Sequence, residues 1–274
     1  MIFVTESTGA RKMAHLGQPF LGQTVILAGG APTLTQQPLE LLGQRGVLTA
    51  AINNAALHFQ PSMWFCADNP NSFSPQILAD PRIMKFCPMC HIATKLDNRK
   101  NMKFNQIPNV YFYIQKQDLS LYEALSPRME TPWYFNTLFI AFYVLYQLGC
   151  RRIILTGSDF EFSSDGSVYA HSEGLNPRER GLNEALYKKL IADLKICKPV
   201  FDHAGLTLMD ASTKSKLGDT YQTLSLAEAV ELCREDFPAA VDTAKLPHGT
   251  QFATDKLKKQ LGLEVGPPAE WDEH

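Results

Sequence analysis

The 274-residue chain lacks a charge excess of either sign, because 26 Lys and Arg stand against 28 Asp and Glu and leave a net charge of −2. A general electrostatic attraction to nucleic acid or to an anionic membrane surface is therefore excluded as the basis of its function. Hydrophobic residues make up 45% of the chain and charged residues 20%, which is typical of a folded globular protein. This length suffices for one large domain or two small ones with a substantial core.

The sequence also lacks an apolar run that is long enough to cross a bilayer. The longest such stretch, residues 133–149, is interrupted by Asn136, Thr137 and Gln147 and predicts a buried helix. No basic segment followed by an apolar run marks the start of the chain, so we expect no signal peptide and no transmembrane segment. The six cysteines are then expected to be free thiols in a cytoplasmic protein.

Short apolar runs alternate with helical segments along most of the chain. The strand candidates are residues 24–29, 46–53, 62–68, 83–87, 109–114, 151–157 and 205–212. The helix candidates are residues 34–45, 74–80, 135–148 and 179–196, and a peripheral helix that opens at Ser225. Because continuous apolar runs suit strands covered on both faces, the alternation predicts an α/β fold with an open, mostly parallel sheet and helices on both faces.

The domain that contains this sheet is expected to occupy residues 24–244. Residues 1–23 are then an N-terminal extension, and residues 245–274 are a C-terminal appendage that is partly flexible and carries a short helix at 251–261. The sequence contains no internal repeat and leaves the formation of a homo-oligomer open.

A glycine pair follows the first predicted strand in the stretch "VILAGGAPTL", residues 25–34. In parallel α/β sheets ligands bind beyond the carboxyl ends of the strands, and glycines there allow a phosphate to approach the main chain. Gly29 and Gly30 therefore indicate either a turn beside a phosphate or only a tight corner after a strand. The pair alone does not decide between these two interpretations.

Polar residues follow three further strands and open the long buried helix. They are Asn53 and Asn54, Asp68 and Asn69, Gly157, Ser158 and Asp159, and Asn136 and Thr137. Because Asn and Asp are common in turns and helix caps, each cluster has a purely structural explanation. Their shared position at strand ends nevertheless predicts one site for a polar ligand of nucleotide size.

The stretches "VILAGGAPTL", "INNA", "DNP", "NTLFIAFYVLYQLGCRRIILTGSDF" and "GSVYA" resemble, in this order, the landmarks of bacterial sialyltransferases of the Campylobacter type. The chain is also similar to the wider group of proteins related to archaeal hydroxymethylpterin diphosphokinases. The resemblance covers about residues 24–170 and extends more loosely to about residue 217. It implies a Rossmann-like domain that binds a nucleotide sugar without a metal and transfers the sugar to a glycan or another hydroxyl acceptor. It also implies a lid-like segment at about residues 161–185.

The resemblance implies specific positions for the donor site. They are Gly29, Gly30 and Ala31 in the turn, Asn53, Asn69, Asn136, Thr137, Gly157 and Asp159 at strand and helix ends, and Tyr169 at the donor phosphate. Gly30 replaces an asparagine of the family, which removes one side-chain donor. The histidine that serves the family as general base has no counterpart at its position, and His171 lies nearby at a different spacing.

Sugar transfer requires a base for the acceptor hydroxyl and groups that stabilise the leaving phosphate. The base candidates are His171, Asp159 and Glu161, and the phosphate candidates are Tyr169, Arg178 and Arg180. Two alternatives remain open. One is a diphosphate transfer to a pterin alcohol, which requires Mg²⁺ bound by Asp68 and Asp159. The other is a nucleotide-binding module without catalytic activity.

The segment "CPMCH", residues 87–91, matches the pattern of haem attachment, but that modification requires export. Zinc is a second interpretation, with Cys87, Cys90 and His91 as ligands and Cys66 as a fourth from a neighbouring strand. Since no second ligand pair is present, we favour reduced thiols at a strand end and keep zinc and redox chemistry as alternatives.

Overall fold

The computed structural model of the protein describes residues 2–5, 11–13, 16, 18–97, 102–116, 125, 131–132, 136–162, 170 and 177–236. Its first seven strands are β1 (Ile2–Thr5), β2 (Arg11–Met13), β3 (Thr24–Ala28), β4 (Thr49–Ile52), β5 (Met63–Phe65), β6 (Met84–Pro88) and β7 (Val110–Tyr113). The later strands are β8 (Gln115–Lys116), β9 (Thr131–Pro132), β10 (Arg152–Thr156), β11 (Thr207–Asp210) and β12 (Gln222–Thr223).

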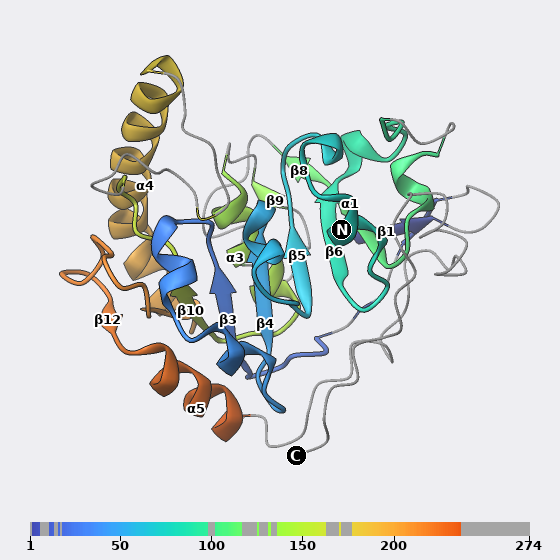
Figure 1. Ribbon diagram of the computed structural model, residues 1–274. Coiled ribbons are helices and arrows are strands. Elements are labelled where there is room, and N and C mark those ends of the chain that lie inside the picture. The colour runs from blue at the N-terminus through green and yellow to red at the C-terminus, as the bar shows by residue number, and fades with distance from the viewer. Residues whose placement is uncertain are drawn as a thin grey trace.

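Ten of these strands form one sheet in the order β12-β11-β10-β3-β4-β5-β6-β7-β1-β2 (Figure 1). The eight strands from β12 to β7 run parallel, whereas β1 pairs antiparallel with β7 and with β2. A separate parallel pair consists of β8 and β9. The predicted α/β fold with an open, mostly parallel sheet is therefore confirmed.

The α-helices are α1 (Pro75–Ala79), α3 (Thr137–Gln147), α4 (Pro177–His203) and α5 (Leu226–Asp236). In the described part of the chain, six short 3₁₀ helices lie between the strands: η1 (Pro32–Gln36), η2 (Leu39–Gly43), η3 (Asn53–Leu57), η4 (Pro70–Ser72), η5 (Met89–His91) and η6 (Phe104–Gln106). The single helix predicted for residues 34–45 is wrong. Pro38 holds the preceding Gln37 extended, at ψ 156°, and so separates η1 from η2.

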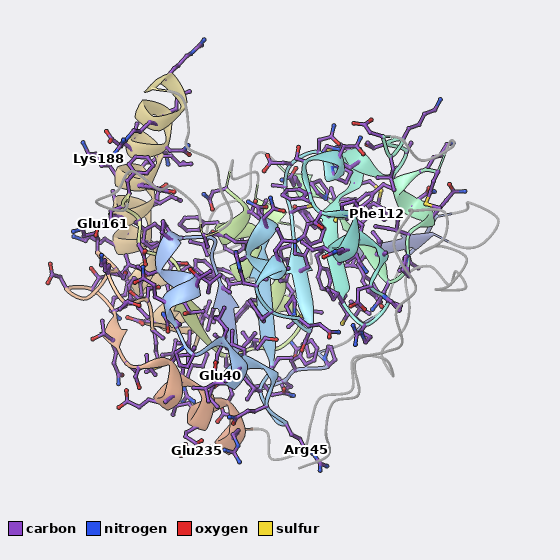
Figure 2. All side chains as sticks on the ribbon, in the orientation of Figure 1. Glu40, Arg45, Phe112, Glu161, Lys188 and Glu235 are labelled. Carbon is purple, nitrogen blue, oxygen red and sulfur yellow. The ribbon has the colours of Figure 1, made fainter. Side chains whose placement is uncertain are left out.

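Both faces of the sheet are covered, as its continuous apolar strands require. All five residues of β3 are buried. Val25 and Leu27 face a core that includes α3 and part of α4, whereas Ile26 and Ala28 face cores that include α5 and α1. Figure 1 shows α3 behind the central strands. Exposed charged side chains such as Lys188 and Glu235 project from the outer surfaces of the helices (Figure 2).

The N-terminal segment 1–23 contributes β1 and β2, which extend the sheet at its β7 edge. Phe20 in the same segment is fully buried, and its N–H donates to the carbonyl oxygen of Leu148 at 2.9 Å. These contacts attach the expected extension to the domain. The predicted appendage 245–274 lies outside the described residues, as does most of the segment between 163 and 176. No helix in the described parts of the chain is long and apolar enough to cross a membrane.

Candidate functional site

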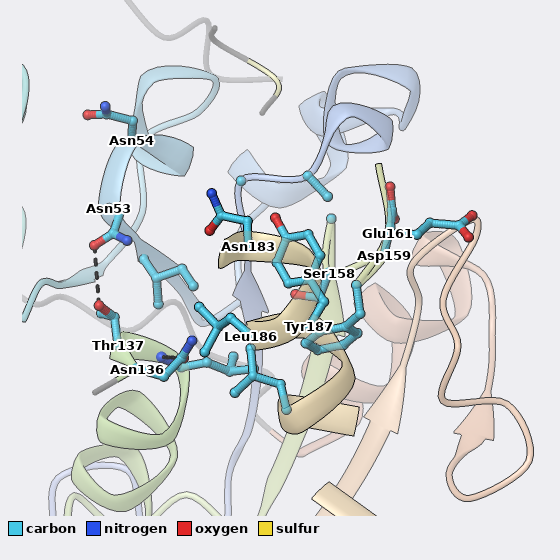
Figure 3. A pocket seen from close by; sticks show the side chains of 18 of the residues that line it. Asn53, Asn54, Asn136, Thr137, Ser158, Asp159, Glu161, Asn183, Leu186 and Tyr187 are labelled. Carbon is cyan, nitrogen blue, oxygen red and sulfur yellow. Dashed lines mark hydrogen bonds between the residues drawn. The ribbon is translucent and has the colours of Figure 1, made fainter. Parts of the chain in front are cut away.

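A cavity of about 430 Å³ lies at the carboxyl ends of β3, β4 and β10, between these strand ends, α3 and α4 (Figure 3). Its lining includes most of the residues that the sequence assigned to a ligand. They are Gly29, Gly30, Ala31, Asn53, Asn54, Asp68, Asn136, Thr137, Gly157, Ser158, Asp159 and Glu161. The structure thus brings together segments that are far apart in the sequence, although the role of each residue stays a prediction.

The glycine turn has a structural task. The N–H groups of Gly29 and Ala31 donate to the carbonyl oxygens of Thr156 and Gly157 at 2.8 and 2.9 Å. A Cβ atom on Gly29 would lie 2.5 Å from the Ser158 hydroxyl oxygen and 2.6 Å from the carbonyl oxygen of Gly157. The turn is therefore a tight corner where the ends of β3 and β10 meet, and two of its N–H groups are used inside the fold. Its outer side still borders the cavity.

Asn53 presents its side chain to the cavity from an unusual backbone conformation. Its φ of +51° lies in the left-handed region, which asparagine tolerates better than most residues. The indole N–H of Trp64 donates to its carbonyl oxygen at 2.7 Å, and the Thr137 hydroxyl donates to its Oδ1 at 3.4 Å. With Oδ1 engaged, the amide nitrogen Nδ2 is turned toward the cavity (Figure 3).

The first turn of α3 forms another side of the cavity. Asn136 caps this helix, since its Oδ1 accepts from the N–H of Leu138 at 2.7 Å. The 11-residue helix therefore begins at the cavity, and its dipole places partial positive charge there. Asn136 serves as a helix cap and as a lining residue at once, so the two interpretations of its sequence position do not exclude each other.

Carboxylates supply the charge of the described lining. Asp159 is buried, and its Oδ1 accepts from the Thr33 hydroxyl at 2.6 Å. Burial raises the pKa of Asp159, and the negative charges of Glu161 and Asp210 raise it further, against the opposing effect of the Thr33 hydrogen bonds. Lys216 forms an ion pair with Glu161 at 2.7 Å. Asp159 is thus a carboxylate with increased proton affinity beside a solvent-accessible space.

Some predicted site residues are not part of the lining. Asn69 is exposed and caps η4, because its Oδ1 accepts from the N–H of Asn71 at 3.0 Å. Arg178 and Arg180 are exposed on the first turns of α4, where Arg180 lies 5.0 Å from the centre of the Phe162 ring. These two arginines, predicted to meet the phosphate, do not contribute to the cavity as described.

Tyr169 and His171 lie outside the described residues. Ala170 between them is described, and its N–H donates to the carbonyl oxygen of Gly30 at 2.9 Å. This hydrogen bond ties the chain at residue 170 to the glycine turn.

One wall of the cavity was missed in the sequence. Asn183, Leu186, Tyr187 and Leu190 line it from α4 (Figure 3). Their spacing of three, four and seven residues places them on one face of the helix. The sequence predicts a helix over residues 179–196 with Leu186 and Leu190 on one face, but it assigns none of these four residues to the site. The amide of Asn183 and the phenol of Tyr187 on the same helix face were the only polar signal that this face borders a ligand site.

The zinc interpretation of residues 87–91 finds no support. Cys66 and Cys87 do approach each other, with their sulfur atoms 3.3 Å apart, but both are fully buried in an apolar core whereas Cys90 is exposed. Among the described residues no group of three or more His, Cys, Asp or Glu could hold a metal ion. Asp68 and Asp159 therefore also lack a third ligand of this kind for Mg²⁺.

No protein-family model matches the chain, and no curated protein matches it at a significant level. Among solved structures, it is similar to the sialyltransferase CstII from Campylobacter jejuni, solved in complex with the substrate analogue cytidine-5'-monophosphate. The sequence identity is 11% and the TM-score 0.42, and the match covers 88% of this chain and 98% of that chain.

Proposed function

We propose that the cavity binds a nucleotide-activated sugar and that the protein is a glycosyltransferase-like enzyme of the sialyltransferase type. The observation that carries this proposal is the convergence of side-chain amides from separate segments with a buried carboxylate. Asn53, Asn54, Asn136 and Asn183 line the same cavity as Asp159. Amides donate and accept hydrogen bonds, which suits sugar hydroxyls and nucleobase edges, and the volume lies within the usual range of ligand sites.

The described lining favours contacts with the uncharged parts of such a ligand. It contains Asp68, Asp159 and Glu161 and, within the described residues, no Lys or Arg. Carboxylates repel a diphosphate, so we assign the nucleoside and the sugar to the amide-lined part. We assign the phosphates to the rim at Gly30 and, as the resemblance implies, to Tyr169.

Asp159 is the general base in this proposal. The base must take the proton of an acceptor hydroxyl while the bond between the sugar and the phosphate breaks. A raised pKa strengthens a carboxylate as a base, and the Thr33 hydroxyl holds one of its oxygen atoms in place. His171 and Glu161 remain the other predicted candidates for this proton transfer.

The experiment follows nucleotide release from CMP-, UDP- and GDP-sugars by the full-length protein, with and without EDTA. We expect turnover of one donor class that EDTA leaves unchanged. Turnover of a sugar donor that EDTA abolishes would indicate a metal-dependent sugar transfer. The diphosphate transfer would be favoured if no sugar donor reacts but ATP is consumed with a pterin alcohol in the presence of Mg²⁺. Nucleotide binding without turnover of any donor would favour a binding module without catalytic activity.

A further inference from the structure

Two cysteines lie side by side at the ends of neighbouring strands. Cys66 directly follows β5, Cys87 belongs to β6, and the register that pairs Phe65 with Phe86 places the two cysteines opposite each other. Their sulfur atoms are 3.3 Å apart. The N–H of Cys66 donates to the carbonyl oxygen of Phe86 at 3.2 Å, so the backbone ladder holds the pair together.

The surroundings of the pair are apolar. Both side chains have no solvent exposure and belong to the core that includes α1 and β7. The Tyr113 hydroxyl donates to the carbonyl oxygen of Cys66 at 3.0 Å and fixes its backbone. The two sulfur atoms are in contact within this core. A small shift of the two strand ends would bring them from this separation to the length of a disulfide bond.

A third cysteine connects the pair to solvent. Cys90 follows Cys87 in a C-x-x-C arrangement, lies in η5 and is exposed. Burial raises the pKa of the Cys66 thiol most, and the hydrogen bond to Cys87 and the charges of Cys87, Asp68 and Cys90 raise it further. Because it is exposed and only three residues from Cys87, Cys90 is the thiol of this group that a dissolved reagent can reach.

We propose that Cys66 and Cys87 form a reversible disulfide by exchange with a low-molecular-weight disulfide, and that Cys90 is the entry thiol. The Cys90 sulfur attacks the reagent RSSR, forms a mixed disulfide and releases one RSH. Cys87 then attacks the Cys90 sulfur and releases the second RSH, and Cys66 attacks Cys87 and restores the Cys90 thiol. In each step one S–S bond forms, one breaks, and the proton of the attacking thiol passes to the leaving sulfur. The net reaction oxidises two protein thiols and reduces RSSR to two RSH.

The test treats the folded full-length protein with oxidised glutathione, blocks remaining thiols under denaturing conditions and analyses tryptic peptides by mass spectrometry. Cleavage after Arg82 and Lys85 places Cys66 and Cys87 on different peptides. We expect a cross-linked peptide pair with Cys90 alkylated, and we expect dithiothreitol to reverse the link. Because the pKa values of Cys66 and Cys90 are raised by burial, the link should form faster at alkaline than at neutral pH.

Variants separate the entry thiol from the pair. Cys90→Ser alters an exposed side chain and should slow formation of the link at least about tenfold, because the inner thiols lose their access to the reagent. The control Cys197→Ser changes a buried cysteine on α4 and should leave the rate unchanged. Full alkylation of Cys66 and Cys87 after oxidant treatment would overturn the proposal. An unchanged rate in Cys90→Ser would overturn the assignment of the entry thiol.

Discussion

Two buried charged side chains lie at opposite ends of the parallel strands, which we call the amino edge and the carboxyl edge of the sheet. Lys85 lies near the amino end of β6, and its ammonium donates to the backbone carbonyl oxygens of Asp80, Ile83 and Pro108. Asp159 follows the carboxyl end of β10, is held by Thr33 and lines the cavity. Burial lowers the pKa of Lys85 to about 7 and raises the pKa of Asp159.

Two asparagines repeat this contrast. Asn109 precedes β7 at the amino edge with φ 56°, and its amide donates to the carbonyl oxygen of Pro81 at 3.1 Å. Asn53 follows β4 at the carboxyl edge with φ 51° and turns its amide toward the cavity. Asparagine in a left-handed conformation thus makes a hydrogen bond within the fold at the amino edge, and lines a candidate ligand site at the carboxyl edge. What a polar group faces, more than its burial, indicates its role.

The largest effect is expected for Asp159→Asn, which keeps the acceptor for the Thr33 hydroxyl but cannot take up a proton. If Asp159 is the base, turnover of the nucleotide sugar should fall by roughly 10²- to 10⁴-fold. Initial rates at saturating donor measure this loss. Unchanged rates in a folded variant would show that Asp159 is not the base.

The same variant should change how stability depends on pH. Because the folded pKa of Asp159 is raised, its contribution to stability is fully present below the ordinary Asp pKa of about 3.9. That contribution declines as pH rises through the raised value. Asp159→Asn lacks this decline, so its free energy of unfolding should increase relative to that of the wild type as the pH rises above about 4. Denaturant unfolding at several pH values tests the sign, which a parallel pair of curves would contradict.

At the amino edge, Lys85→Met should cost about 3 kcal/mol in the free energy of unfolding, because it leaves buried carbonyls without donors. Turnover per folded molecule should stay at the wild-type value. The control Lys189→Met removes only an exposed ion pair with Asp193 and should cost less than about 0.5 kcal/mol. A loss of turnover in folded Lys85→Met would contradict the purely structural role that we assign to Lys85.

Gly29→Ala tests the close contact between the ends of β3 and β10. Its Cβ would lie 2.5 Å from the Ser158 hydroxyl oxygen, so we expect a loss of about 2 kcal/mol in the free energy of unfolding. Gly181→Ala in α4 is the matched control. It meets no atom within 4 Å and should stabilise the protein by about 0.5 kcal/mol through helix propensity. Equal stabilities of the two variants would mean that the corner is looser than described.

The smallest effect is expected for Thr137→Val. This change removes the hydroxyl that donates to Asn53 Oδ1 at 3.4 Å, a long hydrogen bond. We expect the affinity for the nucleotide to fall about threefold while thermal stability changes little. Calorimetric titration with the best-binding nucleotide measures the change, and an increase in affinity would contradict the proposed orientation of the Asn53 amide.

The sequence predicted the sheet well because its central strands are continuous apolar runs that need cover on both faces. It did not predict β1 and β2, which are short strands at one edge. The two 3₁₀ turns in place of a helix at 34–45 follow from Pro38, whose effect on Gln37 overrides the apolar spacing. Polar strand ends also predicted the location of the cavity.

The α4 wall and the role of the glycine turn were not predictable in the same way. Leu186 and Leu190 form a helical stripe that is equally typical of a core, and only the folded position of α4 turns it toward the cavity. Gly29 is needed because the residues that follow β10 approach it closely. A contact between segments so far apart in the chain cannot be predicted from the sequence pattern. Spacing along the chain reports which residues share a face but not what that face meets.

The most direct test of the central claim is calorimetric titration of the full-length protein with CMP, UDP and GDP, repeated with Asn53→Asp and Asn69→Asp. Asp tolerates the left-handed backbone of residue 53 and keeps the acceptor for Thr137, but it lacks the Nδ2 donor. We predict that one nucleotide binds with one-to-one stoichiometry, that Asn53→Asp weakens it at least about tenfold, and that Asn69→Asp leaves it unchanged. Absence of binding for all three nucleotides, or equal affinities for the wild type and Asn53→Asp, would contradict the account.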